Sequence, residues 1–179
     1  MDLRRITEPY NFRGQTFVIT GGTGVLCSEM VRAILGCGAN VALIVRSPEK
    51  ADKMFGGQSE YAGNLLTIKG DVLDNKSLVK AADVVQGEFG VVNGLINGAG
   101  GNHPEATTAA DRSFFQLPQE AMKFVQELNL QGTILPCQIF GKAMAEQGNG
   151  VILNISSMSA FLPLTKVIGY SAAKAAINN

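Results

Sequence analysis

A serine, a tyrosine and a lysine near the end of the chain have a spacing that could support proton transfer. Ser157 precedes Tyr170 by thirteen residues, and Lys174 follows Tyr170 by four. Because four residues are about one helical turn, Tyr170 and Lys174 would share a helix face. A free phenol keeps its proton up to about pH 10, and a neighbouring ammonium favours the ionised form. Tyr170 could then exchange a proton near neutral pH while the Ser157 hydroxyl holds a carbonyl oxygen.

The same spacing also has a simpler interpretation, a surface tyrosine beside a solvated lysine, and the surrounding chain must decide between the two. The run Val151–Ile155 is apolar and bounded by polar and glycine residues, which predicts a buried strand. Ser157 would then lie at the carboxyl end of a strand, where ligands bind in open α/β sheets.

Composition narrows the class of protein. The chain has 179 residues, enough for a single domain with a core, and 46% of them are hydrophobic against 17% charged. Fifteen basic residues balance fifteen acidic ones without a charge run, so neither a nucleic acid nor a membrane surface is expected as partner. Residues 1–6 lack the apolar core of a signal peptide, and no apolar run approaches the ~20 residues of a membrane span.

The three cysteines, Cys27, Cys37 and Cys137, are odd in number and lack C-x-x-C spacing. This pattern predicts neither a disulfide framework nor a metal site. Because free thiols persist in reducing compartments, the cytoplasm is the expected localisation.

Strand and helix patterns alternate along the whole chain. This order predicts right-handed βαβ crossovers and a doubly wound parallel sheet with helices on both faces, which is the α/β class. The predicted strands are 16–20, 40–45, 65–68, 92–97 and 151–155. The predicted apolar helix faces are Leu26, Met30, Val31, Ile34 and Leu35 in one helix, and Leu78, Val79, Ala82 and Val85 in another that Asp74 caps. A long helical region over 119–147 is expected to bend near Gly132 and Pro136.

The glycine-rich turn Gly21–Gly24 follows the first predicted strand and opens a helix. Glycines let the backbone approach a pyrophosphate, and free N–H groups at the helix start can bind it, so the turn predicts a dinucleotide site. An acidic residue that binds the ribose of NAD is expected about twenty positions later, but Val45 stands there, followed by Arg46. The arginine favours the 2′-phosphate of NADP, and the alternative is an ordinary surface arginine.

Together these motifs resemble the short-chain dehydrogenase/reductase family over essentially the whole chain. That family binds NAD(P)(H) on a Rossmann-like sheet and acts on small-molecule substrates. The resemblance rests on motifs that follow one another in the family's order, namely Thr20-Gly21-Gly22-Thr23-Gly24, Gly70-Asp71-Val72, Asn97-Gly98-Ala99-Gly100, Asn129, Ser157 and Tyr170-x-x-x-Lys174.

The resemblance implies a role for each matched residue. The implied catalytic set is Asn129, Ser157, Tyr170 and Lys174, in which Asn129 holds a water that resupplies the proton. Asp71 would contact the adenine, and Lys174 would also bind the nicotinamide ribose. A dimer or tetramer is expected, formed through the region 119–147 and the helix that carries Tyr170. The implied cofactor-binding set is Gly21, Thr23, Gly24, Leu26, Arg46, Asp71, Val72, Asn97, Ala99, Gly100, Tyr170 and Lys174.

The chain departs from the family's pattern in two places. Val25 and Cys27 stand at the last two glycine positions of the turn, and Cys27 is expected to cause local strain or weaker cofactor binding. The family's sheet has seven strands, whereas this chain supplies five and ends inside a predicted helix. The sequence is therefore interpreted as one domain over 1–179 that is truncated at its carboxyl end, with 151–155 as an exposed apolar edge.

Two loops, 100–108 and 157–166, resemble the D-mannonate oxidoreductase (fructuronate reductase) branch of the family. That branch reduces a keto-sugar acid, whose carboxylate and hydroxyls need a cation and hydrogen-bond donors. His103, Ser157 and Lys166 are therefore the candidate substrate residues, with Arg112 as a weaker one. Three alternatives stay open: another polyol or keto acid as substrate, a cofactor-binding protein without catalysis, and an incomplete product with no function of its own.

Overall fold

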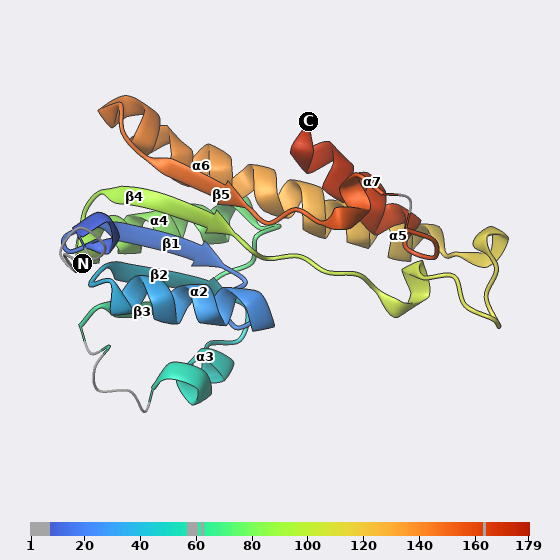
Figure 1. Ribbon diagram of the computed structural model, residues 1–179, viewed down its shortest axis with the longest axis horizontal. Helices are drawn as coiled ribbons and strands as arrows, with labels where there is room; N and C mark the ends of the chain where they lie inside the picture. Colours follow the sequence, from blue (N-terminus) through green and yellow to red (C-terminus); the bar gives the residue numbers. More distant parts are fainter. Residues whose placement is uncertain (1–7, 57–60, 62, 163) are drawn as a thin grey trace, which may run out of the picture.

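The structure is a computed structural model that describes residues 8–56, 61, 63–162 and 164–179. Its centre is a sheet of five parallel strands in the order β3-β2-β1-β4-β5, which confirms the predicted α/β class (Figure 1). The expectation that no signal peptide is present concerns residues 1–6, which lie outside the described residues. The strands are β1 Thr16–Thr20, β2 Asn40–Val45, β3 Leu65–Lys69, β4 Val92–Asn97 and β5 Val151–Asn154.

Helices connect the strands and cover the sheet on both faces (Figure 1). The α-helices are α2 Val25–Gly36, α3 Pro48–Phe55, α4 Asn75–Phe89, α5 Gln119–Gln126, α6 Gly132–Gln147 and α7 Ile168–Asn178. Single-turn elements fill the loops, namely the 3-10 turns η1 Glu8–Tyr10, η3 Pro104–Ala106, η4 Phe114–Gln116 and η6 Met158–Ala160, and the π-helical turn η5 Glu127–Gln131.

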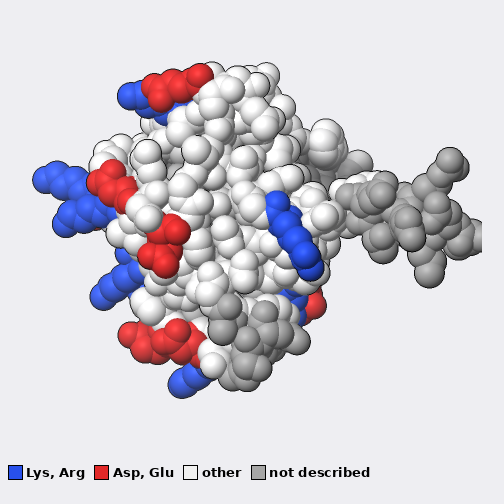
Figure 2. Space-filling view, turned by 90° about the vertical axis from the view of Figure 1, so that its left-hand side faces the viewer, with Lys and Arg blue, Asp and Glu red and all other residues white. Residues whose placement is uncertain are grey.

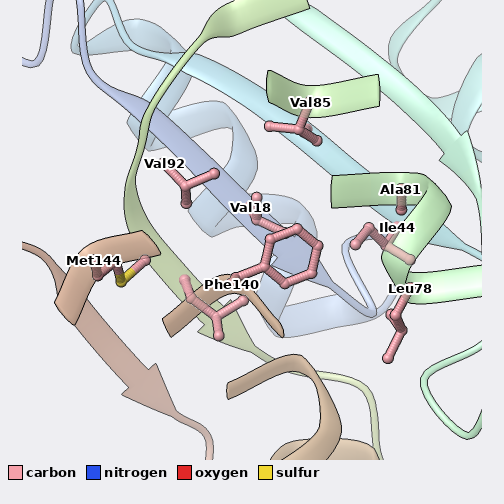
Figure 3. Close-up of a cluster of buried hydrophobic side chains, with 10 residues drawn as sticks. Val18, Ile44, Leu78, Ala81, Val85, Val92, Phe140 and Met144 are labelled. Atoms are coloured by element: carbon pink, nitrogen blue, oxygen red, sulfur yellow. The ribbon is translucent and has the colours of Figure 1, made fainter. Parts of the chain in front are cut away.

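Alternation along each strand divides the core into two layers, because successive strand residues point to opposite faces. Val18 of β1 packs in the layer of α4 and α6, whereas its neighbour Ile19 packs in the layer of α2 and α3. Figure 3 shows the first layer, where the Phe140 ring of α6 lies among side chains of the sheet and of α4. Both layers hold the carboxyl ends of the strands in fixed positions, and the site is built at that end.

Two helix faces differ from prediction by one residue each. Leu26 is 65% exposed and Val79 is 43% exposed, whereas Cys27 and Ala81 are buried in their place. The buried stripe of α2 advances in four-residue steps from Cys27, so Leu26 lies beside the stripe on the solvent side. The predicted helix cap is present, because the Asp74 carboxylate accepts the Lys76 N–H at 3.0 Å.

The long helical region is interrupted by an irregular turn. The irregularity predicted near Gly132 lies directly before that residue, whereas Pro136, the other predicted position, lies inside α6. The irregularity is η5, a π-helical turn that directly follows α5. An extra residue in one turn changes the direction of the side chains around it, and such turns are common at functional sites. Asn129 lies in this turn.

The strand β5 forms the outer edge of the sheet among the described residues, beside β4. The prediction of a buried strand is therefore wrong: Val151, Ile152 and Leu153 are 57%, 40% and 47% exposed. The alternative expectation, an exposed apolar edge, is confirmed. Sequence cannot separate the two, because an edge strand can carry the same apolar residues as a central one.

The surface charge is mixed in sign. Figure 2 views the end of the molecule where the strands begin, and acidic and basic side chains are interspersed there. This agrees with the balance of fifteen basic and fifteen acidic residues in the sequence. In the part of the chain that the structure describes, no helix is both long enough and apolar enough to cross a membrane.

Candidate active site

A cleft of about 370 Å³ opens at the carboxyl ends of the strands. This is the end of an open parallel sheet at which ligands bind. Its walls come from the turns after four strands, so residues distant in sequence meet in one place. The lining residues are Gly21, Thr23, Gly24, Ile44, Val45, Arg46, Ser47, Lys50, Gly70, Asp71, Val72, Gly98, Ala99, Gly100 and Leu128.

The turn after β1 is shaped for a pyrophosphate. Gly21 has φ +69°, and a Cβ there would come within 2.6 Å of the backbone of Gly98 and Ala99, so only glycine fits. The turn closes with a Gly24 N–H to Gly21 C=O bond of 2.9 Å and leads directly into α2. The first N–H groups of a helix have no partner within the helix and carry partial positive charge. A cofactor with a pyrophosphate therefore fits this end of the cleft.

Hydrogen bonds join the ends of β1, β4 and β5. The buried Thr20 hydroxyl accepts the N–H groups of Gly98 and Ala99, each at 3.2 Å. The Asn97 side chain donates to Asn154 Oδ1 at 2.8 Å, and the main-chain carbonyl of Asn97 accepts the Ile155 N–H at 3.1 Å. The turn after β4 is thereby held rigidly against both neighbouring strands.

Cys27 fits its position because a glycine faces it. Its side chain is only 4% exposed, and a Cβ on Gly98 would overlap the Cys27 Sγ. The expected strain is thus avoided by reciprocal packing, in which the missing side chain at Gly98 accommodates the thiol. Burial raises the pKa of the Cys27 thiol, with the nearby Lys174 charge opposing that shift, so the thiol stays protonated and neutral at pH 7.

Lys174 projects from α7 towards Gly100, which lines the cleft, although Lys174 and Tyr170 are not themselves lining residues. Its side chain is 5% exposed, its Nζ donates to the Ile155 carbonyl at 2.7 Å, and a Cβ on Gly100 would lie 3.4 Å from Nζ. The Nζ also lies 5.6 Å from the centre of the Tyr170 ring, as expected for residues one turn apart. Burial lowers the pKa of Lys174, and the interaction with Cys27 opposes this shift.

Asn129 is fully buried in the π-helical turn and joins α5 to the loop after β4. Its Nδ2 donates to the carbonyls of Gly101 and Val125 at 2.7 and 2.8 Å, and its Oδ1 accepts the Gly101 N–H at 3.1 Å. The side chain is therefore occupied by backbone groups. Its main-chain carbonyl accepts the Thr133 hydroxyl at 2.9 Å.

Ser157 lies at the start of η6, which packs against α7. Its Oγ accepts the N–H of Ser159 at 3.2 Å and the hydroxyl of Ser159 at 3.0 Å. With Ser159 donating in both bonds, the Ser157 proton remains free to donate to another oxygen. That is the capacity needed to hold a substrate carbonyl.

The remaining predicted residues divide between the cleft and its supports. Thr23, Arg46, Asp71 and Val72 line the cleft, whereas Asn97 braces the sheet edge and Leu26 faces solvent. Two further residues, Ser47 and Lys50, line the cleft and were not predicted from the sequence. A serine followed by Pro48 is typical of a helix start, which would have placed Lys50 in the first turn of that helix, close to Arg46.

The predicted substrate residues lie in the two loops beside Tyr170. His103 Nδ1 accepts the Glu105 N–H at 3.2 Å, and its ring packs edge-on against Phe124 of α5 at 5.8 Å. The neutral ring therefore carries its proton on Nε2 and can donate from there. Tyr170 itself packs against a small cluster of Ala106, Ala121 and Val125, so η3, α5 and α7 meet at this residue.

The parallel sheet and the glycine-rich turn after β1 agree with the family that the comparison with known proteins finds. The pattern of the family described as short chain dehydrogenase matches residues 15–179, and the chain belongs to that family.

The chain is similar in sequence to individual proteins of this family. An uncharacterised oxidoreductase of Bacillus subtilis, UxuB, is 43% identical over 94% of this chain, and the D-threitol dehydrogenase of Mycolicibacterium smegmatis is 29% identical over 96%. A solved Haemophilus influenzae structure with bound NAD, whose D-mannonate oxidoreductase function is itself a proposal, is 39% identical over 97% of this chain with a TM-score of 0.87. The chain spans about two thirds of these proteins, namely 64%, 64% and 66% of their lengths.

The reciprocal packing of Cys27 and Gly98 generates a testable prediction. Gly98→Ala should lower the free energy of unfolding by about 1–3 kcal/mol, because the new methyl overlaps the thiol. In a Cys27→Ala background the same change should cost about 1 kcal/mol less, since the sulfur is gone. Urea unfolding of the four proteins in this double-mutant cycle measures the coupling.

Gly87→Ala is the matched control, because Gly87 lies in α4 with open space around it and alanine is the better helix former. It should leave stability unchanged or raise it. If Gly98→Ala costs the same with and without the Cys27 sulfur, the packing account is wrong.

Proposed function

We propose that the protein is an NAD(P)-dependent oxidoreductase that interconverts a keto-sugar acid of the D-fructuronate type and the corresponding aldonic acid, D-mannonate. The observation that carries this proposal is the buried Lys174 amine, which lies beside Gly100 in the cofactor cleft and one helical turn from Tyr170. This arrangement couples a cofactor site to a proton donor, which is what carbonyl reduction requires.

Each protein group has a defined task in the proposed reaction. The bound cofactor supplies the hydride that adds to the substrate carbonyl carbon. Tyr170 donates its proton to the carbonyl oxygen, which the free Ser157 hydroxyl holds in position. The Lys174 ammonium favours the tyrosinate that is left behind, and a water held by Asn129 resupplies, by way of Lys174, the proton that Tyr170 has given up. In the direction of oxidation, the same groups act in reverse.

The proposed substrate class rests on the chemistry of the loops and on a relative. The similar Haemophilus influenzae structure carries a proposed D-mannonate oxidoreductase function. His103 offers an Nε2–H donor from a ring fixed by Glu105 and Phe124, which suits a substrate hydroxyl. A neutral polyol is the second candidate, because the chain is also similar to a D-threitol dehydrogenase.

For the cofactor we propose NADP(H). Arg46, Ser47 and Lys50 line the same end of the cleft, where β2 ends and α3 begins. Two cations and a hydroxyl suit a phosphate monoester on the adenosine ribose. Position 45, where an acidic residue would favour NAD, is occupied by valine. Because the similar Haemophilus influenzae structure contains NAD, the choice needs a direct test.

The proposed setting is a homo-oligomer in the cytoplasm. Cys27, Cys37 and Cys137 are free thiols, as a reducing compartment would leave them. A groove of about 750 Å³ lies between α4 and α6, and Val79 and Val91 on its walls are 43% and 54% exposed. Apolar surface of this kind supports association between two copies.

Replacing Tyr170 with Phe tests the chemical role directly. Turnover of D-fructuronate should fall by at least about a hundredfold, because the proton donor is lost. The dissociation constant for the cofactor should stay within about twofold, because the phenol hydroxyl is a small part of a large cofactor interface. Cofactor oxidation is followed by absorbance, and binding by fluorescence, in the protein expressed from its own start codon to its own stop codon.

Tyr10→Phe is the matched control, because Tyr10 lies in η1 and is 62% exposed. It should behave as the unchanged protein. A Tyr170→Phe protein with normal turnover would overturn the mechanism.

Charge removal at Arg46 and Lys50 tests the cofactor proposal. Arg46→Ala and Lys50→Ala should each lower kcat/KM with NADPH by about tenfold, the loss expected for one charge-assisted hydrogen bond. With NADH the values should change little, because that cofactor lacks the phosphate. Lys53→Ala, on the same helix but outside the cleft lining, is the control and should leave both values unchanged. Equal losses with the two cofactors would contradict the proposal.

A further inference from the structure

The backbone of Lys166 is in an unusual conformation. Among the described residues it is the one non-glycine residue with positive φ, at +79°. A side chain with a Cβ costs about 1–2 kcal/mol in this left-handed region, and glycine, or at lower frequency asparagine, is the usual occupant. Strain of this kind persists where the surrounding structure enforces it and is concentrated at functional sites.

The conformation is enforced by the loop that follows β4. The Lys166 carbonyl accepts the Thr108 N–H at 3.0 Å, which joins the segment before α7 to that loop. The loop is in turn braced from inside, because the Thr107 hydroxyl donates to the His103 carbonyl at 3.0 Å. The Arg112 guanidinium donates to the Pro104 carbonyl at 2.9 Å. Position 166 is therefore fixed by contacts of its backbone, which glycine would make equally well.

Lys166 is also near Tyr170 along the chain, and its backbone is joined to a loop that Tyr170 contacts. It precedes Tyr170 by four residues, and the loop to which it is joined contains Ala106, against which Tyr170 packs. Its side chain is exposed and forms no ion pair within the described ranges. Arg112, which follows the first of these loops, has its guanidinium anchored by a hydrogen bond to a backbone carbonyl. Among the residues that the structure describes, the Lys166 ammonium has no such anchor, so it is available to bind a ligand.

We propose that Lys166 is the residue that recognises the carboxylate of the substrate. A lysine at a position where glycine would relieve the strain means that the side chain itself is needed there. An ammonium with three donors attracts a carboxylate as a point charge without demanding one geometry, which suits a flexible open-chain acid. Lys166 thereby discriminates sugar acids from neutral sugars of the same length. This inference rests on the proposed function, because it assigns the substrate class to one residue of that site.

The Lys166→Gly variant separates the charge from the backbone. Because glycine adopts positive φ freely, the melting temperature should stay equal or rise. KM for D-fructuronate should rise about tenfold, as expected for the loss of one hydrogen bond to a charged group, while kcat stays within about twofold. KM for D-fructose, a neutral keto sugar of the same length, should not change. Lys166→Arg keeps the charge and should restore KM for the acid to near its original value.

Ionic strength gives a second readout that a structural role would not change. KM for D-fructuronate should rise with salt in the unchanged protein and lose most of that dependence in Lys166→Gly. Equal KM values for the acid in the two proteins, or equal losses for acid and neutral sugar, would overturn the inference.

Calorimetry of D-mannonate binding to the protein–cofactor complex distinguishes failure of the inference from failure of the proposed function. If D-mannonate binds and Lys166→Gly weakens it, the inference stands even where D-fructuronate is not turned over. If D-fructuronate is turned over and its KM is the same in Lys166→Gly, the inference about Lys166 is overturned and the proposed function stands. If the unchanged protein neither binds nor turns over a sugar acid, both are overturned.

Discussion

The burial of the Lys174 amine is the constraint on which the rest of the site depends. An ammonium taken out of water needs hydrogen bonds in return, and the Ile155 carbonyl supplies one at 2.7 Å. For this to happen, α7 must pack close enough to bring the amine to the end of β5. Gly100 must also lack a side chain, because a Cβ there would lie 3.4 Å from Nζ and 2.7 Å from Asn129 Oδ1. One buried charge thus fixes three segments that are distant in sequence.

The π-helical turn and the start of α2 both pack against the loop that follows β4. On one side, Asn129 in η5 binds both the N–H and the C=O of Gly101, so the loop after β4 cannot move away from α5. On the other side, Cys27 of α2 packs against Gly98 and so fixes the start of that helix on the same turn. The cleft and the side chains of Asn129 and Lys174 therefore share one element, the segment 97–101. A displacement of α2 or of η5 would therefore also displace the segment 97–101.

The sequence predicted those features that depend on local patterns. The strands 16–20, 40–45 and 92–97 were predicted to the residue, because each is an apolar run bounded by turns. The spacing of Tyr170 and Lys174 predicted their shared helix face, and the structure places the Nζ 5.6 Å from the ring centre. The glycine turn was placed at the cofactor site by its position after a predicted strand, and Asp71 by the resemblance to the family; both line the cleft.

Features that depend on three-dimensional neighbours were missed. A π-helical turn leaves no periodic signal, so the interruption was predicted near Gly132 and Pro136 without its π-helical form. The strand β5 is exposed because it lies at the edge of the sheet. Its amino-acid composition does not indicate whether it is an edge strand or a central one. Cys27 can occupy its buried position in α2 because Gly98, about seventy residues away in the sequence, has no side chain. The strained backbone of Lys166 follows from a hydrogen bond to Thr108 that no local pattern predicts.

The central claim is that the buried Lys174 amine assists proton transfer by Tyr170, and the pH profile of the proposed D-mannonate oxidation at saturating cofactor tests it most directly. The profile is compared between the unchanged protein and Lys174→Met. The account predicts that the two profiles differ in shape as well as in height, because Lys174→Met removes the amine that lies 5.6 Å from the centre of the Tyr170 ring. Two profiles of the same shape, differing in height alone, would contradict the account and assign Lys174 a purely binding role.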